Sequence, residues 1–174
     1  MKKQSSLLLI LMLLLVLAGC GAKSAPTEPP ELTVTNAQGV SITAMGGSYD
    51  WDYEAGGGQR TGAIACGMHP LDETLRDSTP TLEMPIAVSA SFYYTVTLSF
   101  GDCAPDSITL RYWNEQCWGD TQAKAEKLTV QRQDDGTYTV ELFPSVGIFE
   151  VDAQWDAEDY CGRAFYSFCT KAAE

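Results

Sequence analysis

The sequence contains little of what catalysis on a substrate would require. It has a single histidine, His69, and 11 basic residues against 23 acidic ones. One imidazole is too few for a histidine-rich metallohydrolase site. The HExxH, GxSxG and phosphate-loop motifs are also absent. An acidic surface repels nucleic acid. We therefore expect no nucleic-acid partner, no metal site and no cofactor.

The sequence also lacks an apolar run long enough to cross a bilayer. Its unbroken apolar run, residues 7–18, has 12 residues, whereas a membrane-spanning helix needs about 20. The run follows Lys2 and Lys3, an arrangement typical of a signal peptide. The letters LAGC at residues 17–20 resemble the lipobox of bacterial lipoproteins. The resemblance implies cleavage before Cys20 and a diacylglyceryl thioether on that residue; plain secretion or an uncleaved anchor is the alternative.

The rest of the chain divides into a spacer and one domain. Residues 20–30 are predicted to be the lipidated cysteine and a proline-rich tether without apolar periodicity. Residues 31–174 are long enough for one domain of ordinary size. Loss of residues 1–19 removes two lysines and no acid, so the formal charge of −12 becomes −14. We expect an acidic domain that lipid holds at the outer face of the cytoplasmic membrane.

From residue 31 onward, apolar residues mostly alternate with polar ones, a pattern that indicates half-buried strands. A short hairpin turn is expected at residues 134–136, and helical turns only at residues 70–77 and 119–127. Seven or more short strands separated by turns predict an all-β sandwich. The clearest predicted strands are residues 92–100, 107–113, 127–132, 137–143, 148–155 and 162–169.

Two stretches carry resemblances to known families. Residues 147–168 resemble the last two strands of bacterial immunoglobulin-like domains, although Phe149 stands where a tyrosine is usual. Residues 33–73 together with 105–115 resemble an uncharacterised family of small Gram-positive bacterial lipoproteins, with related modules on larger membrane sensors. The resemblance implies an immunoglobulin-like antiparallel β-sandwich that binds or senses at the cell surface. It implies no particular activity.

Five cysteines follow the lipobox, more than the family usually has in this domain. An exported chain can keep disulfides, and an odd number leaves at least one thiol free. The alternating strand directions place Cys103 and Cys161 at one end of the domain and Cys117 and Cys169 at the other. We predict disulfides Cys103–Cys161 and Cys117–Cys169 with Cys66 free, although Cys66 could replace any of these partners.

Two groups of residues support a catalytic alternative. Asp50, Asp52 and Glu54 share one face of a predicted strand, where carboxylates could bind Ca²⁺ or form a glycosidase pair. His69 follows Cys66 by three residues, a spacing at which a Cys–His nucleophile pair can meet. We favour the simpler interpretations: a solvated acidic face, and a loop histidine that bonds to the backbone and fixes a turn.

Aromatic residues offer the remaining indication of binding. Tyr93 and Trp113 face away from the apolar sides of their strands, and Trp118 lies in a predicted loop. Exposed aromatic side chains can stack on sugars or anchor a protein partner. The alternative is that the second sheet or the N-terminal segment covers them.

The sequence thus predicts a membrane-anchored surface lipoprotein that acts as a non-catalytic binding or sensing module for a surface protein or a carbohydrate. One alternative is a surface hydrolase that uses either the acidic row or the Cys66–His69 pair. Another is a protease-inhibitor or chaperone-type interaction module. The candidate binding residues are Trp113, Trp118, Tyr93, Asp50, Asp52, Glu54 and His69.

Overall fold

The computed structural model describes residues 25–86 and 92–173. The predicted signal peptide, Cys20 and residues 21–24 lie outside this range. In the described part of the chain, no helix is long and apolar enough to cross a membrane.

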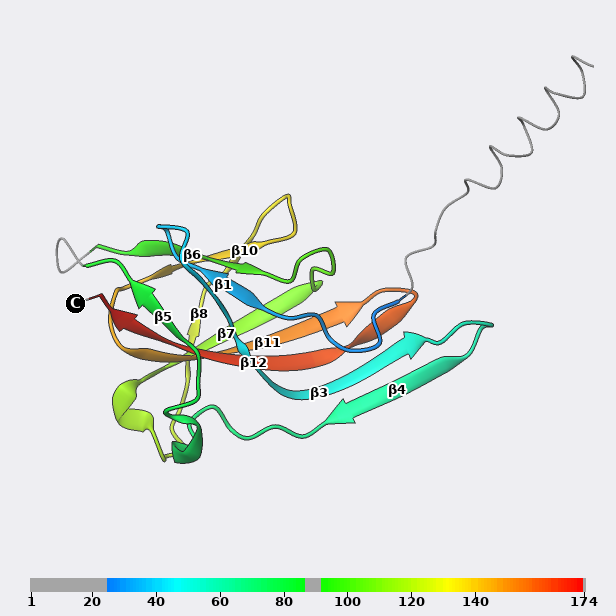
Figure 1. Cartoon of the computed structure of the whole chain (residues 1–174), viewed down its shortest axis with the longest axis horizontal. Coiled ribbons are helices and arrows are strands. Elements are labelled where there is room, and N and C mark those ends of the chain that lie inside the picture. Colours follow the sequence, from blue (N-terminus) through cyan, green and yellow to red (C-terminus); the bar gives the residue numbers. More distant parts are fainter. Residues whose placement is uncertain (1–24, 87–91, 174) are drawn as a thin grey trace, which may run out of the picture.

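Two β-sheets pack face to face as a sandwich, the upper and lower layers in Figure 1. The small sheet has the strand order β2-β1-β6-β10-β9. Its strands are β1 (Thr33–Thr35), β2 (Ser41–Thr43), β6 (Tyr94–Ser99), β9 (Gln131–Arg132) and β10 (Tyr138–Leu142). This architecture confirms the predicted all-β class and is consistent with an immunoglobulin-like fold.

The large sheet has the order β4-β3-β12-β11-β7-β8, and β5 pairs with the end of β12. All of its ladders are antiparallel except the parallel pairing of β5 with β12. Its strands are β3 (Met45–Glu54), β4 (Arg60–Ala65), β5 (Thr81–Met84), β7 (Ser107–Asn114), β8 (Glu126–Leu128), β11 (Gly147–Asp156) and β12 (Tyr160–Ala172).

The core lies between the sheets and follows the period-two pattern of the sequence. Val96 and Leu98 of β6 are fully buried, as is Val151 of β11. Trp155 packs edge-to-face on Trp51, with ring centroids 5.2 Å apart. Alternate residues of each strand therefore supply one continuous apolar layer, as the alternation predicts.

The predicted strand at residues 127–132 is wrong as a single element. Its first part, β8, belongs to the large sheet, whereas its last part, β9, belongs to the small sheet. The chain crosses from one layer to the other between them, so β8 ends one sheet and β9 ends the other, and among the described residues no ladder joins the two sheets along this edge. The hairpin after β9 is present: Gly136 has a φ of +84° and the Gln133 amide donates to the Thr137 carbonyl at 2.8 Å.

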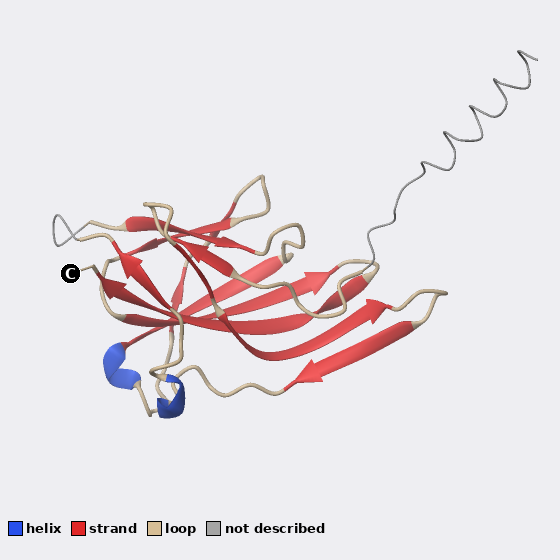
Figure 2. Cartoon of the chain, in the orientation of Figure 1, coloured by secondary structure: helices blue, strands red, loops and turns tan. Residues whose placement is uncertain are grey.

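A second, smaller apolar cluster lies on the outer face of the large sheet. It contains Leu71, Trp113, Ile148 and Cys169, and we call it the outer core. Two short 3-10 helices and their loops cover it (Figure 2). The helices are η1 (Glu73–Leu75) and η2 (Glu115–Cys117). A helical turn is thus present within residues 70–77, but the one predicted at 119–127 is replaced by η2, which directly follows β7.

The second half of the predicted tether lies against the domain. The indole nitrogen of Trp51 donates to the Pro26 carbonyl at 2.8 Å, and the Tyr166 hydroxyl donates to the Pro30 carbonyl at 2.7 Å. Leu32, just after these residues, is fully buried. Residues 26–30 are therefore attached to the sandwich surface.

Candidate functional site

The acidic row of β3 is a solvent-exposed face. Asp50, Asp52 and Glu54 are all exposed and point to the outer side of the large sheet, with Asp50 opposite Arg163 of β12. Neighbours two residues apart on a strand are separated by about 7 Å. Within residues 25–86 and 92–173, no three His, Cys, Asp or Glu side chains are placed to hold a metal ion. The three carboxylates therefore do not converge on a common point.

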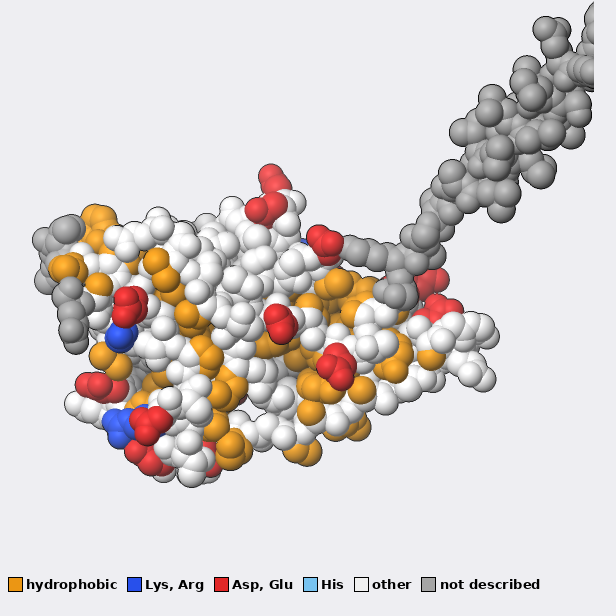
Figure 3. All heavy atoms as spheres, in the orientation of Figure 1, with side chains coloured by type: hydrophobic (Ala, Val, Ile, Leu, Met, Phe, Trp, Pro, Cys, Tyr) orange, Lys and Arg blue, Asp and Glu red, His pale blue; other side chains and the backbone are white. Residues whose placement is uncertain are grey.

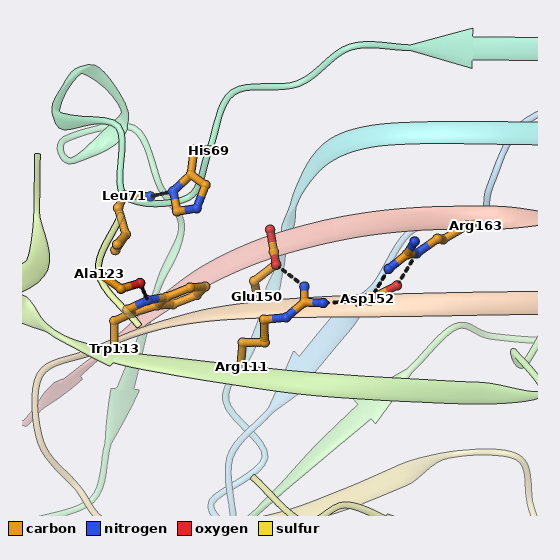
Figure 4. Close-up of polar contacts among 8 residues, drawn as sticks. All are labelled: His69, Leu71, Arg111, Trp113, Ala123, Glu150, Asp152 and Arg163. Carbon is orange, nitrogen blue, oxygen red and sulfur yellow. Dashed lines mark hydrogen bonds and ion pairs between the residues drawn. The ribbon is translucent and has the colours of Figure 1, made fainter. Parts of the chain in front are cut away.

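His69 lies in the loop that covers the outer core. Its Nδ1 atom accepts a hydrogen bond from the Leu71 amide at 3.1 Å, and its ring meets Trp113 edge-on at 5.9 Å (Figure 4). Cys66 is exposed, and among the described residues no hydrogen bond joins it to His69. The imidazole therefore fixes a turn of this loop, which accounts for its place in the fold.

A ladder of charged side chains crosses the outer face of the large sheet, and sequence reasoning missed it. Arg111 of β7 bonds to both Glu150 and Asp152 of β11, and Arg163 of β12 makes two hydrogen bonds of 2.6 Å to Asp152 (Figure 4). Asp152 is only 5% exposed. The sequence places Glu150 and Asp152 outward, but their partners follow only from the registers of three strands.

Electrostatics keep this ladder ionised. Burial alone would raise the pKa of Asp152, but hydrogen bonds and positive charge from Arg163 and Arg111 outweigh burial, so the pKa lies below its ordinary value. The hydrogen bond to Asp152 in turn raises the pKa of Arg163. Oppositely charged groups that are paired in this way hold neighbouring strands together. They are also poor donors or acceptors of protons.

Neither predicted disulfide is present: all five described cysteines are free thiols. The carbonyl of Cys103 accepts from the indole of Trp155 at 2.8 Å, on the core side of the large sheet. Cys161 lies on the opposite face, where its sulfur accepts from Arg60 at 3.1 Å. The two cysteines share one end of the domain, as predicted, but the sheet separates their side chains.

Cys117 and Cys169 also share an end, and both belong to the outer core or its margin. Cys169 is buried, and burial raises the pKa of its thiol to about 11. The Cys117 thiol is directed at the Asn114 side chain, 3.7 Å away. Cys66 is an exposed thiol.

The three predicted surface aromatics have different environments. Trp113 is only 4% exposed, because the loop around Leu71 covers it, and its indole donates to the Ala123 carbonyl at 2.9 Å. Its assignment as a binding residue is therefore wrong. Trp118 is half-buried beneath the guanidinium of Arg76. Tyr93 is 56% exposed and is available to a ligand.

Tyr93 lines a cleft of about 400 Å³ at the open edge of the sandwich. We call it the edge cleft, and it lies where β8 and β10 belong to different sheets. Its floor is Phe149 of β11, which stacks on Phe168 at 4.9 Å and contacts Tyr112 of β7 at 5.3 Å. The ring of Phe143 meets Tyr93 at 5.9 Å. The principal lining residues are Tyr93, Tyr112, Glu126, Leu128, Phe143 and Phe149.

A glycine makes room for the aromatic floor of the edge cleft. A Cβ atom at Gly147 would lie 2.8 Å from the Tyr112 ring and 2.9 Å from the Phe149 ring. Such approaches are shorter than van der Waals contact, so any larger residue would displace the rings. The glycine at the start of β11 therefore allows the two rings to keep their positions in the cleft.

Glu126 and the Tyr112 phenol form a polar pair in the lining of the cleft. Glu126 of β8 is the register partner of Tyr112 of β7. Burial, and then the negative charge of Glu126, raises the pKa of the Tyr112 phenol. The phenol therefore remains a neutral hydrogen-bond donor beside an acceptor.

Rings from both sheets and a few polar groups give the edge cleft the composition typical of ligand sites. Sequence reasoning found only Tyr93, since the other residues come from segments that the fold alone brings together. Comparison with protein-family models, with curated proteins and with solved structures finds no match to the chain.

Proposed function

We propose that the protein is a lipid-anchored extracytoplasmic lipoprotein whose domain binds a ligand in the edge cleft without chemical conversion. The observation that carries this proposal is the aromatic cleft of about 400 Å³, open at one edge of the sandwich. The leader and the LAGC letters at residues 17–20 support anchoring through Cys20.

The arrangement of carboxylates favours binding over hydrolysis. Glu126 and Glu141 both line the edge cleft, but the Glu141 carboxylate already accepts a hydrogen bond from the Thr95 hydroxyl at 2.6 Å on the outer side of the small sheet. A glycosidase needs two carboxyl groups that flank one bond. The outer-face carboxylates Glu150 and Asp152 are engaged by arginines. The edge cleft therefore offers recognition groups rather than an acid–base pair.

The cleft fits an amphipathic ligand. Phe143 and Tyr93 offer apolar ring surface, which stacks on sugars or packs on apolar side chains, and the nearly buried Phe149 closes the floor. Glu126 accepts hydrogen bonds and attracts positive charge. β11 holds Phe149 in place, and Tyr93 and Phe143 directly flank β6 and β10, which limits the side-chain entropy lost on binding. A surface protein segment and a carbohydrate both meet these requirements.

Fluorine NMR of protein labelled with 3-fluorotyrosine tests the proposal. The probes are chitotetraose and a ten-residue peptide in which lysine alternates with valine or phenylalanine. At least one probe should shift the Tyr93 and Tyr112 resonances saturably and leave Tyr160, at the other end of the domain, unchanged. If neither probe does so, the proposed function is wrong.

A matched pair of variants locates the binding. Tyr93→Ser removes an exposed ring of the cleft and should weaken the active probe by about tenfold. Ile64→Ser removes a side chain that is 75% exposed on the distant strand β4, and affinity should stay within about twofold. Equal losses in the two variants would place the binding outside the cleft.

A further inference from the structure

We infer that the ligand of the edge cleft is a basic, extended peptide segment of a partner protein, which adds as a strand to the open edge of β10. This inference rests on the proposed binding function and names the class of ligand.

The first observation is an incomplete ladder. β10 pairs with β6 along its whole length, from Tyr138 to Leu142. On its other side it pairs with β9 only at Tyr138 and Thr139. Among the residues that the structure describes, no strand pairs with the remaining edge, from Val140 to Leu142. Backbone groups along such an edge can pair with an added strand.

The second observation is a groove alongside this edge. A hollow of about 300 Å³ between residues 128–131 and 139–141 adjoins the edge cleft, since Leu128 and Glu141 line both. The combined groove follows β10 toward Phe143. Four residues of a strand span about 13 Å, so a short extended peptide has both a pairing edge and a space beside it.

The third observation is the pattern of side chains across the groove. Alternate side chains of an added strand point to opposite faces. One set would face the core side, where Leu142 and Phe149 lie, and the other would lie beside Glu141 on the outer side of the small sheet. Apolar residues fit the first environment, and lysine or arginine fits the second.

Charge selects the partner. Glu126 and Glu141 flank the groove, and the whole chain carries a formal charge of −12. Figure 3 shows acidic side chains scattered over one face of the molecule, with few basic ones. A second copy of the chain paired through β10 would bring its own Glu141 to this edge, and like charges across a ladder are unfavourable. A basic partner is attracted instead.

Peptide binding measured by fluorescence anisotropy tests the inference. The probe is the alternating lysine peptide described above, labelled with fluorescein, and its counterpart has glutamate in place of lysine. The lysine peptide should bind, and the glutamate peptide should bind at least about tenfold more weakly. Equal affinities would contradict the role of charge.

Backbone methylation tests strand addition separately. N-methyl groups on the odd or on the even residues remove the amide donors from one edge of the peptide or from the other. One of the two methylated peptides should lose at least about tenfold in affinity, and the other should stay within about threefold. If both bind like the parent peptide, no strand is added to β10.

Charge reversal on the domain completes the test. Glu126→Lys and Glu141→Lys, both at exposed residues, should each weaken the lysine peptide by about fivefold or more and strengthen the glutamate peptide. Asp77→Lys, in the exposed loop after η1, is the matched control and should change neither affinity more than twofold.

Binding of chitotetraose alone would overturn this inference and leave the proposed function standing. A concentration-dependent dimer that the peptide does not dissociate would also overturn this inference. The proposed function would still stand in that case if chitotetraose shifted the Tyr93 and Tyr112 resonances saturably.

Discussion

Asp152 lies on the outer face of a sheet, yet the side chains of Arg111 and Arg163 bring its exposure down to 5%. Hydrogen bonds to a charged group contribute about 1.5–3 kcal/mol. The two arginines are partly exposed, so solvent screens some of the charge interaction. These ion pairs join β7, β11 and β12. Removing them should therefore lower the stability of the large sheet.

Asp152→Asn should lower the free energy of unfolding by about 1–3 kcal/mol at pH 7. Because folding lowers the pKa of Asp152, its stabilising contribution is full above the unfolded value of about 3.9. The contribution is then lost as the pH falls through the lower, folded value. Urea unfolding of wild type and variant from pH 7 to pH 3 should therefore show the difference shrinking below about pH 4.

Asp52→Asn is the control for this prediction, because Asp52 is exposed on β3. It should change the free energy of unfolding by less than about 0.5 kcal/mol. A difference between wild type and Asp152→Asn that grows as the pH falls would show that the carboxylate is not stabilised in the folded state.

The alternation of apolar and polar residues predicts the positions of some side chains and not of others. It correctly placed Val96 and Leu98 in the core and Asp152 on the opposite face. It also placed Trp113 outward, but the indole is buried by a loop whose path no local pattern specifies. Likewise, no local pattern indicates that Arg111, 41 residues before Asp152, bonds to it.

At the scale of elements, the outer core is a separate packing unit. Leu71 reaches it from the loop before η1, while Ile148 and Cys169 come from neighbouring strands. The cover consists of two three-residue helices and loops, so it has few internal contacts of its own. Such units open locally at a lower free energy than the whole domain.

Leu71→Ala should therefore expose Cys169. In fully reduced wild-type protein, a maleimide at pH 7.5 should label exposed Cys66 first and Cys169 slowly, since burial raises the pKa of the Cys169 thiol to about 11. The variant should label Cys169 more than about tenfold faster, because removing a buried leucine side chain costs about 2–5 kcal/mol. Peptide mass mapping identifies the labelled cysteine.

Val96→Ala, in the core between the sheets, is the control for local opening. It should lower global stability without a comparable rise in Cys169 labelling. If labelling of Cys169 follows global unfolding equally in both variants, the outer core does not open as a unit.

Strand direction and strand face differ in how well a sequence determines them. Successive strands alternate in direction, and this rule grouped Cys103 with Cys161 and Cys117 with Cys169 by end. Face depends on the path of the connecting loop, and the loop at Cys103 lies on the core side of the sheet. The split of residues 127–132 between two sheets had the same cause: both parts have the strand pattern, but only packing assigns them to layers.

For the whole molecule, the fold class could be predicted because period-two strands and turn residues recur along the chain. The edge cleft could not, since it arises from the crossing between β8 and β9 and from rings in or beside β6, β7, β10 and β11. The proposed lipid anchor is also a property of the whole molecule. A single acyl chain gives only marginal membrane attachment, whereas two chains hold a protein stably.

The charge of the domain bears on the proposed anchor. The proposed loss of residues 1–19 would leave a formal charge of −14, which anionic lipids repel, so under this proposal only Cys20 should hold the chain at a membrane. Intact-mass analysis should find a chain that begins at Cys20 and carries a diacylglyceryl group, and high salt should not release it from membranes. Cys20→Ser should lack the lipid and keep residues 1–19, whereas Cys66→Ser should be processed normally. Wild-type protein that retains residues 1–19 with Cys20 unmodified would show that the lipobox resemblance is misleading.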